Sequence, residues 1–444
     1  SQYIFTLPID KLPRETFMKI SKTKLENRVV FLDNLRWLFV VFVILEHSSN
    51  AYRSLNWWPV ADKATSIIAG WVSAFSDASA MPLLFYIAGY FAIPTIDKKG
   101  TFYFLKGKLK RLGIPWLVCI LTICPILPLV YHFTRHDLSL STSYWELWVL
   151  LFKNAADFNV GLVVSMNDLM MNNQFYQRYM WFISLLITFF FIFSLLYSIK
   201  KDWFSRFDQP ITQQNPSFAA TLKYLLGIGF LTSFFSFLMV GLIMAFGPKS
   251  SNSEPLFTLG NIIQFRPSRI FLFIIYFCLG VMTFRNRWIE RGKFPGHFKI
   301  WGISFVGLLI VYLFVYSQMH YGPDHLKEIY GIVFFFILNF LTIATLGFFS
   351  SIGLRYWNRP TFFGRKMASN SYDMYLSHYI FVLVFQLILY MLPGIPGLFK
   401  FPLVSMLSII CAYIVSEFFI KSFPRLSIIA TIVMFAAMVL LIHP

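Results

Sequence analysis

The sequence predicts an all-α bundle of transmembrane helices, and three observations support this fold class. The chain of 444 residues is 57% hydrophobic, and only 13% of its residues are charged. Its mean hydropathy is +0.64. In a soluble globular chain, about a quarter of the residues would be charged. Apolar runs of about 20 residues, the length that crosses a bilayer, recur along the whole sequence.

We place eleven spans along the chain and divide it accordingly into three parts. The spans lie near residues 29–50, 65–96, 111–132, 178–199, 219–246, 266–285, 297–319, 327–351, 370–391, 401–421 and 425–443. A short KSFPR turn separates the last two. The three parts are an N-terminal segment (1–28), a transmembrane domain (29–421) and an additional C-terminal helix (422–443).

The net charge of +18 arises mainly from loops on one side of the predicted bundle. The loops on that side contain 26 Lys and Arg residues, and the loops on the opposite side contain 10. Because basic residues collect on the cytoplasmic side, we expect a cytoplasmic N-terminus and a multi-pass protein of the bacterial inner membrane. The same asymmetry explains the positive charge without a nucleic-acid partner. The polar, basic N-terminus does not resemble a cleavable signal peptide, and the four cysteines lie in apolar runs, which does not predict a metal site.

The first predicted span contains four ionisable side chains, in the stretch LDNLRWLFVVFVILEHSSNAY. Arg36 and His47 are eleven residues apart, which places them on one helix face about 16 Å from each other. Asp33 precedes Arg36 by one turn and is expected to pair with it. Glu46 points about 100° away from His47 and either stabilises a protonated imidazole or pairs with another helix. A snorkelling Arg36 and a buried structural His47 are the alternative, but ionisable groups within spans usually indicate a functional site.

A second cluster of charge begins the third span, in FYFLKGKLKRLGIP. Lys108 and Arg111 are three positions apart in the sequence, and Lys106 and Lys110 lie close to them. Several cations at one mouth are typical of a phosphate-binding pocket. Anchoring of the span on its cytoplasmic side is the alternative function for any one of these lysines.

Four further motifs place polar or aromatic residues near the ends of spans. Each has a structural alternative, namely an aromatic belt, an interfacial anchor or a hydrogen bond between helices. The residues are Asp77, just before MPLLFYIAGYF; Arg178 and Trp181 in RYMWFISLL; Arg266 and Arg269 in QFRPSR; and Tyr375 and His378 in SYDMYLSHYI. In the first of these motifs, Gly89 predicts a close approach of two helices.

Taken together and in this order, these motifs resemble the acyltransferase 3 family of integral membrane acyltransferases. The arginine, ten residues and histidine of the first span match at Arg36 and His47, and the resemblance extends from Arg28 to about Lys421. The LDNLRW opening is most similar to the glucan-succinylating branch, the glucan biosynthesis protein C group. The family often has two arginines in the basic segment, whereas Lys108 occupies the first position here, so the bidentate fork of an arginine is lost there.

The resemblance implies a ten-helix core, often with an added helix, and an O-acyltransferase activity. An acyl-coenzyme A donor, with an acetyl or succinyl group, would bind from the cytoplasm, and a surface or periplasmic glycan would accept the acyl group outside. His47 would act as general base or acyl carrier, because the pKa of imidazole lies near neutrality. The other residues that we assign are Arg36, Glu46 and Asp33 beside His47; Arg36, Lys108, Arg111, Tyr375 and His378 for the donor; and Arg178, Trp181, Asp77 and Arg266 for the acceptor. No metal is expected.

A proton-coupled transporter or flippase of a glycan or lipid precursor is the alternative, with Arg36, Glu46 and His47 as a relay. Many transporters contain internal repeats and paired broken helices, and this sequence shows neither clearly. The expected partners are membrane lipids, acyl-coenzyme A and the carbohydrate acceptor, and the sequence is compatible with a homo-oligomer.

Overall fold

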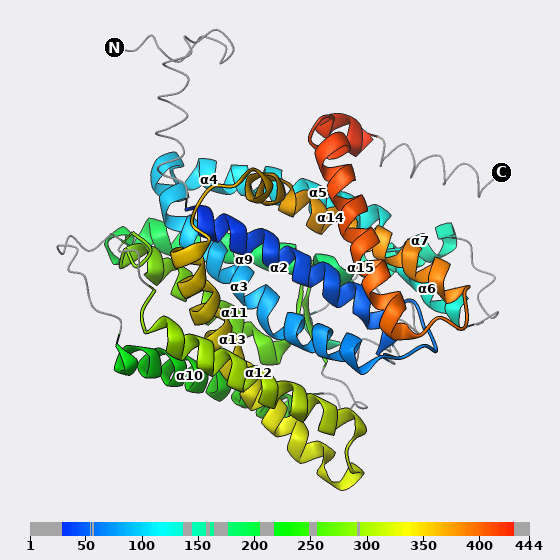
Figure 1. The fold of residues 1–444 in the computed structure, drawn as a ribbon. Helices are drawn as coiled ribbons and strands as arrows, with labels where there is room; N and C mark the ends of the chain where they lie inside the picture. Colours follow the sequence, from blue (N-terminus) through cyan, green and yellow to red (C-terminus); the bar gives the residue numbers. More distant parts are fainter. Residues whose placement is uncertain are drawn as a thin grey trace.

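The computed structural model describes residues 29–53, 55, 57–135, 144–156, 160–163, 176–204, 217–247, 255–290 and 294–429. These residues form a bundle of helices (Figure 1). The long helices are α2 (Val30–Ser49), α3 (Ile67–Lys99), α9 (Trp181–Ile199), α10 (Phe218–Phe246), α11 (Pro267–Arg285), α12 (Phe298–Tyr321), α13 (Lys327–Tyr356), α14 (Phe362–Tyr390) and α15 (Gly397–Ile414). The shorter ones include α4 (Thr101–Lys108), α5 (Ile114–Thr122), α6 (Ile126–Thr134) and α7 (Tyr144–Ala156).

Nine stretches of the described chain are long and apolar enough to cross a membrane. Helix α2 has 20 residues, which is the length of a further span, although it contains Asp33, Arg36 and Glu46. These ten stretches confirm the all-α bundle and agree with the positions of the first ten predicted spans, except that the third begins earlier than predicted. The predicted segment 1–28 and residues 430–443 of the last predicted span lie outside the described residues.

Helix α2 lies in the middle of the bundle and packs against α3, α14, α15 and α13 (Figure 1). One side of α2 is fully buried, with Phe31, Leu32, Phe39, Val43 and Ile44 in the core. A helix with ionisable groups is stable at this position because neighbouring helices, and not lipid, surround those groups.

Helices α3 and α11 cross closely, and two glycines permit this approach. A Cβ atom at Gly89 would lie 2.1 Å from the carbonyl oxygen of Phe277, and a Cβ atom at Gly280 would lie 2.0 Å from that of Tyr86. No other residue fits at either position without a backbone shift. The structure therefore confirms the close approach predicted at Gly89.

The third span differs from a single straight helix. It begins at Thr101 rather than near residue 111, and its α-helical pattern changes to a π-helix at Leu109–Gly113 before α5. Pro115 lies in the first turn of α5 and has no N–H to donate to the preceding turn, which accounts for the local change in hydrogen bonding. The basic segment is therefore helical, and the π-helix contains Lys110 and Arg111.

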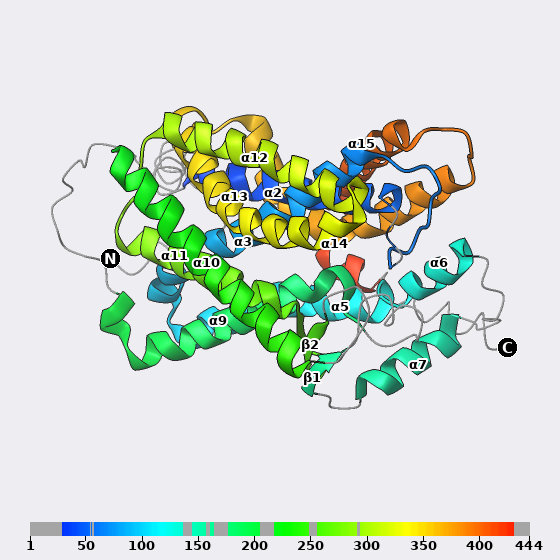
Figure 2. The ribbon, with the colours of Figure 1, turned by 90° about the horizontal axis from the view of Figure 1, so that it is seen from below.

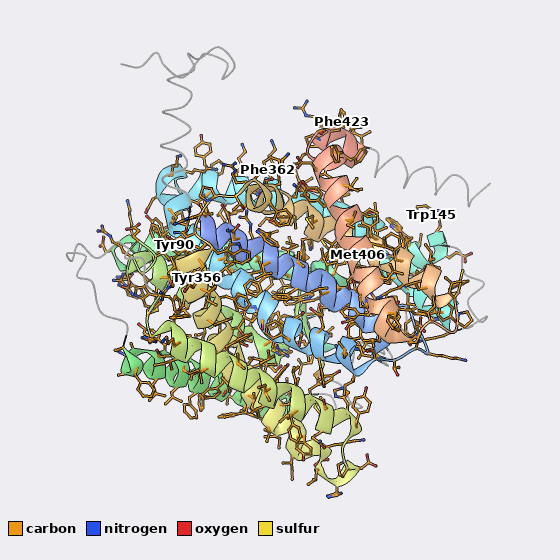
Figure 3. The ribbon with its side chains drawn as sticks, viewed as in Figure 1. Tyr90, Trp145, Tyr356, Phe362, Met406 and Phe423 are labelled. Atoms are coloured by element: carbon orange, nitrogen blue, oxygen red, sulfur yellow. The ribbon has the colours of Figure 1, made fainter. Side chains whose placement is uncertain are left out.

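Apolar side chains cover the outside of the described bundle. Phe234 and Met244 on α10 and Ile303 on α12 are exposed. Met406 and Phe423, labelled in Figure 3, are also exposed, on α15 and just after it. Exposed surface of this composition is suited to contact with lipid tails.

A short antiparallel sheet, which the sequence did not indicate, lies at the edge of the bundle (Figure 2). Strand β1 (Val160–Val163) pairs with β2 (Leu256–Leu259), and β2 pairs with β3 (Ile263–Phe265). Strand β1 belongs to the long segment between the third and fourth spans, so the sheet connects that segment to the start of α11.

Candidate functional site

The ionisable residues of α2 lie at two different ends of the bundle. Asp33 and Arg36 are in its first two turns, and Glu46 and His47 are in its last turn. Arg36 lines one pocket and His47 lines another, and the two pockets have no lining residue in common. We call them the Arg36 pocket and the His47 pocket.

The Arg36 pocket has a volume of about 540 Å³ and is bordered by α2, α3, α4, α9 and α14. Its lining includes four basic side chains and one carboxylate, namely Arg36, Lys99, Lys108, Arg111 and Asp33. The hydroxyl-bearing residues Thr95, Ser369, Ser371, Tyr372 and Tyr375 also line it. Its chemistry is that of a site for a large, anionic and partly apolar molecule.

Arg36 is held in this pocket by α14 and by its own helix. Its Nη2 donates to the carbonyl oxygen of Ala368 at 3.0 Å, and its Nε donates to Ser371 Oγ at 3.2 Å. The same Nη2 lies 3.1 Å from Asp33 Oδ1, which confirms the predicted ion pair. These contacts fix the direction of the guanidinium group.

Lys108 belongs to the same pocket and lies against aromatic rings. Its Nζ is 3.8 Å from the ring centroid of Phe190 and 5.3 Å from that of Phe104. A cation over an aromatic face is stabilised by the ring quadrupole. The ammonium group of Lys108 is therefore positioned at the wall of the pocket, at the place where related proteins often have an arginine.

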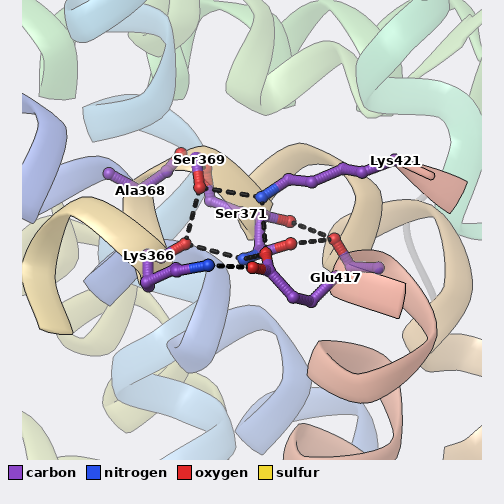
Figure 4. Close-up of polar contacts among 8 residues, drawn as sticks. Lys366, Ala368, Ser369, Ser371, Glu417 and Lys421 are labelled. Carbon is purple, nitrogen blue, oxygen red and sulfur yellow. Dashed lines mark hydrogen bonds and ion pairs between the residues drawn. The ribbon is translucent and has the colours of Figure 1, made fainter. Parts of the chain in front are cut away.

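A cluster around Glu417 holds the segment of α14 that binds Arg36 (Figure 4). The π-helix Val415–Ile420 follows α15 and contains Glu417. Its carboxylate accepts from Lys366, from Lys421 at 2.9 Å and from Asn370 Nδ2 at 2.8 Å. Since Asn370 lies between Ala368 and Ser371, this cluster supports the turn whose oxygens accept from Arg36.

The His47 pocket is smaller, about 100 Å³, and its charges are nearly balanced. Its lining includes the carboxylates of Glu46 and Asp77 and the guanidinium groups of Arg178, Arg266 and Arg269. Asp77 Oδ2 lies 2.8 Å from Arg269 Nη2. Trp58 and Trp181 contribute aromatic surface. Within the described residues, no group of three His, Cys, Asp or Glu side chains is placed to bind a metal ion.

Arg178 is buried in this pocket with an unusual backbone conformation. Its φ angle is +58°, a region that costs a non-glycine residue about 1–3 kcal/mol. The preceding residue, Gln177, fixes the turn: its N–H donates to Gln264 Oε1, and its Nε2 donates to the carbonyl oxygens of Asn261 and Ile262. The small sheet therefore helps to position Arg178, because its β3 strand and the turn before β3 bind Gln177.

His47 is paired with a second histidine on α14. Its Nδ1 lies 2.8 Å from His378 Nε2, and the two rings are nearly coplanar, with an interplanar angle of 5°. His378 Nδ1 lies 2.7 Å from the carbonyl oxygen of Tyr375. The ring of Trp58 stacks on His47 at 5.7 Å, and its Nε1 donates to Gln386 Oε1.

Two tyrosines separate the pockets beside this histidine pair. Tyr375 lines the Arg36 pocket, and Tyr179 lines the His47 pocket. The hydroxyl of Tyr375 donates to the backbone carbonyl oxygen of Tyr179 at 2.5 Å. The hydroxyl of Tyr179 donates to the backbone carbonyl oxygen of Leu376 at 3.1 Å. These two bonds join the turn that precedes α9 to the middle of α14.

The structure places most of the residues singled out from the sequence in two groups. The first group lines the Arg36 pocket and consists of Arg36, Asp33, Lys108, Arg111 and Tyr375. The second lines the His47 pocket and consists of His47, Glu46, Asp77, Arg178, Trp181 and Arg266. His378 contacts His47 and lines neither pocket. Sequence reasoning did not find Gln386, Gln177 or Glu417, although a glutamate inside the apolar stretch IVSEFFI is a signal for the last.

The comparison with known families gives one match that covers most of the chain. The acyltransferase 3 family model, described as an acyltransferase domain, matches residues 29–417. Comparison with curated proteins and with solved structures gives no significant match. The matched region includes both pockets and nearly all of the nine apolar stretches, and the chain therefore belongs to the acyltransferase 3 family and is a multi-pass membrane acyltransferase.

Proposed function

We propose that this protein is an O-acyltransferase that moves an acetyl or succinyl group from acyl-coenzyme A to a hydroxyl of a surface or periplasmic glycan. One observation carries the proposal: Arg36 and His47 lie on one helix, in a cationic pocket and a charge-balanced pocket at opposite ends. An enzyme that accepts its two substrates from opposite sides of a membrane requires such an arrangement.

The charge of the Arg36 pocket supports coenzyme A as the donor. Coenzyme A carries a pyrophosphate and a ribose phosphate, and four basic side chains line this pocket against one carboxylate that is already paired. Arg36 and Arg111 are suited to bidentate contacts with phosphate, and Lys108 supplies a point charge. The distribution of Lys and Arg among the loops supports a cytoplasmic opening for this pocket, in the bacterial inner membrane.

His47 is the group that we assign to the chemistry. The acceptor oxygen attacks the thioester carbonyl while its proton moves to the imidazole; the carbon–sulfur bond then breaks, and the thiolate leaves with that proton. In a two-step route the imidazole first takes the acyl group, with release of coenzyme A, and then transfers it to the acceptor hydroxyl. In both routes the thioester must reach His47 from the Arg36 pocket, and the hydrogen-bonded Tyr375 and Tyr179 belong to the linings of the two pockets.

The composition of the His47 pocket supports a hydroxyl-rich acceptor. Glu46 and Asp77 are acceptors for sugar hydroxyls, and Arg178 and Arg266 are donors. Trp181 offers an apolar face to a sugar ring. The near balance of charge favours a neutral glycan over a strongly anionic one. The similarity of the LDNLRW opening to the glucan-succinylating branch supports succinyl as a transferred group.

The proposal is tested by acyl transfer with the purified protein in proteoliposomes. Labelled acetyl- and succinyl-coenzyme A are supplied on one side and oligosaccharides on the other, and the products are identified by mass spectrometry. Glycans from cells with and without the gene identify the natural acceptor in the same way. Binding of coenzyme A together with a labelled glycan ester is the expected result. Proton-dependent uptake or flipping without coenzyme A binding would instead establish a transporter.

A further inference from the structure

The pair of histidines in the core determines where the protons of both rings lie. His378 Nδ1 lies 2.7 Å from the backbone carbonyl oxygen of Tyr375. Because a carbonyl oxygen only accepts hydrogen bonds, His378 Nδ1 must carry the proton. In a neutral imidazole the other nitrogen is then an acceptor. His47 Nδ1, 2.8 Å from His378 Nε2, must therefore be the donor.

Burial keeps His378 neutral in this arrangement. Its side chain is fully buried, and it contacts a carbonyl group, the imidazole of His47 and the aromatic rings of Tyr179, Tyr375 and Tyr379. In the described part of the chain no carboxylate forms a salt bridge with it. A buried cation without a carboxylate partner is strongly unfavourable.

The remaining nitrogen of His47 follows from this proton assignment. With Nδ1 protonated and directed at His378, the lone pair of the imidazole is on Nε2, on the opposite side of the ring. No described residue forms a hydrogen bond with Nε2, and His47 lines the His47 pocket. Trp58 stacks on the ring, and Gln386 Nε2 donates to the backbone carbonyl oxygen of His47 at 3.0 Å.

We propose that His378 is a positioning residue that fixes the tautomer of His47, so that Nε2 is the atom that takes the proton or the acyl group. This inference rests on the proposed function, because it concerns the same histidine. His378 performs with a neutral ring the role that a carboxylate performs in serine hydrolases. A neutral partner is suited to the interior of a membrane bundle, where a buried carboxylate would be strongly destabilising.

The first test compares two substitutions of similar size at His378. His378→Gln retains both polar contacts, since its amide oxygen accepts from His47 Nδ1 and its amide nitrogen donates to Tyr375. We expect its kcat to fall by less than about tenfold. His378→Met removes both contacts, and we expect kcat to fall by about 10²-fold or more with an unchanged donor KM, as a wrong tautomer does elsewhere. Equal loss in both variants would overturn the inference.

The second test methylates one nitrogen of His47 at a time in the full-length protein. Methylation of Nε2 blocks the reactive atom and leaves the lone pair on Nδ1, which then has no proton to donate to His378, so we expect no transfer with normal coenzyme A binding. Methylation of Nδ1 in the His378→Ala variant forces the lone pair onto Nε2, and we expect it to restore kcat at least about tenfold over that variant. Full activity of the Nε2-methylated protein would refute the assignment even if His378→Met did not fold. Normal transfer by His47→Ala would instead refute the proposed function itself.

Discussion

The Arg36 pocket and the His47 pocket lie at the two ends of one helix and differ in both volume and charge. The first encloses about 540 Å³ with four basic side chains and one carboxylate. The second encloses about 100 Å³ with three basic side chains and two carboxylates. Under the proposed function, the larger and more basic pocket would bind the anionic donor, and the smaller one would hold the reacting part of the acceptor.

The two pockets also differ in how their key side chain is supported. Arg36 is held by a turn of α14 whose conformation depends on the Glu417 cluster, near the end of the bundle. His47 is held in the core by His378, Trp58 and Gln386. Arg36 is thus held by one ion pair and two hydrogen bonds, and His47 is held by neutral hydrogen bonds and aromatic rings. We expect substitutions in the two pockets to change different kinetic constants.

The largest effect is expected at His47. His47→Ala removes the proposed base or acyl carrier, and we expect kcat to fall by about 10²–10⁴-fold. The Kd for coenzyme A should remain unchanged, because His47 does not line the Arg36 pocket. Transfer from labelled donor and calorimetric binding measure the two quantities. His325→Ala, at an exposed histidine on the same side of the bundle, is the control. Weaker donor binding in His47→Ala would contradict the assignment of donor binding to the Arg36 pocket alone.

The next effect is expected at Arg36 and concerns the donor. Arg36→Ala removes charge-assisted contacts of about 1.5–3 kcal/mol, which corresponds to a rise of about 10- to 150-fold in the donor Kd. We expect Arg36→Lys to recover only part of this loss, since lysine has no planar fork. Arg359→Ala removes an exposed arginine at the same end of the bundle and should bind normally. Unchanged donor binding in Arg36→Ala would show that the donor does not use this pocket.

A smaller effect is expected at Asp77 and concerns the acceptor alone. Asp77→Asn keeps the shape of the side chain but removes the charge that faces Arg269 at 2.8 Å. We expect the acceptor KM to rise by about three- to tenfold, the effect of weakening one charged contact, while the donor KM does not change. Kinetics with varied oligosaccharide concentration measure this. Asp324→Asn, at an exposed carboxylate, is the control. A change in the donor KM would show that the pockets are coupled.

The sequence predicted the parts of this comparison that depend on one helix. Hydropathy gave the positions of ten spans, and helical periodicity placed Arg36 and His47 on one face of α2. The contact between His47 and His378 joins residues 331 positions apart. Periodicity within each helix does not determine how two helices are rotated and shifted against each other, so this contact was not predicted. The ion pair of Asp77 with Arg269 was not predicted for the same reason.

The smallest effect is expected at Glu417, which supports the Arg36 pocket without lining it. Glu417→Gln keeps a hydrogen-bond acceptor for Asn370 but removes the negative charge between Lys366 and Lys421. The two ammonium groups then repel each other, and the turn that accepts from Arg36 becomes less well fixed.

We expect the donor KM of Glu417→Gln to rise by about two- to fivefold with an unchanged acceptor KM, which is a smaller loss in free energy than that expected for Arg36→Ala. Glu290→Gln, at an exposed glutamate, controls for the loss of one charge. In a double mutant with Arg36→Ala the effect of Glu417→Gln should disappear, because it acts through Arg36. Additive effects would show instead that Glu417 stabilises the bundle independently of the donor pocket.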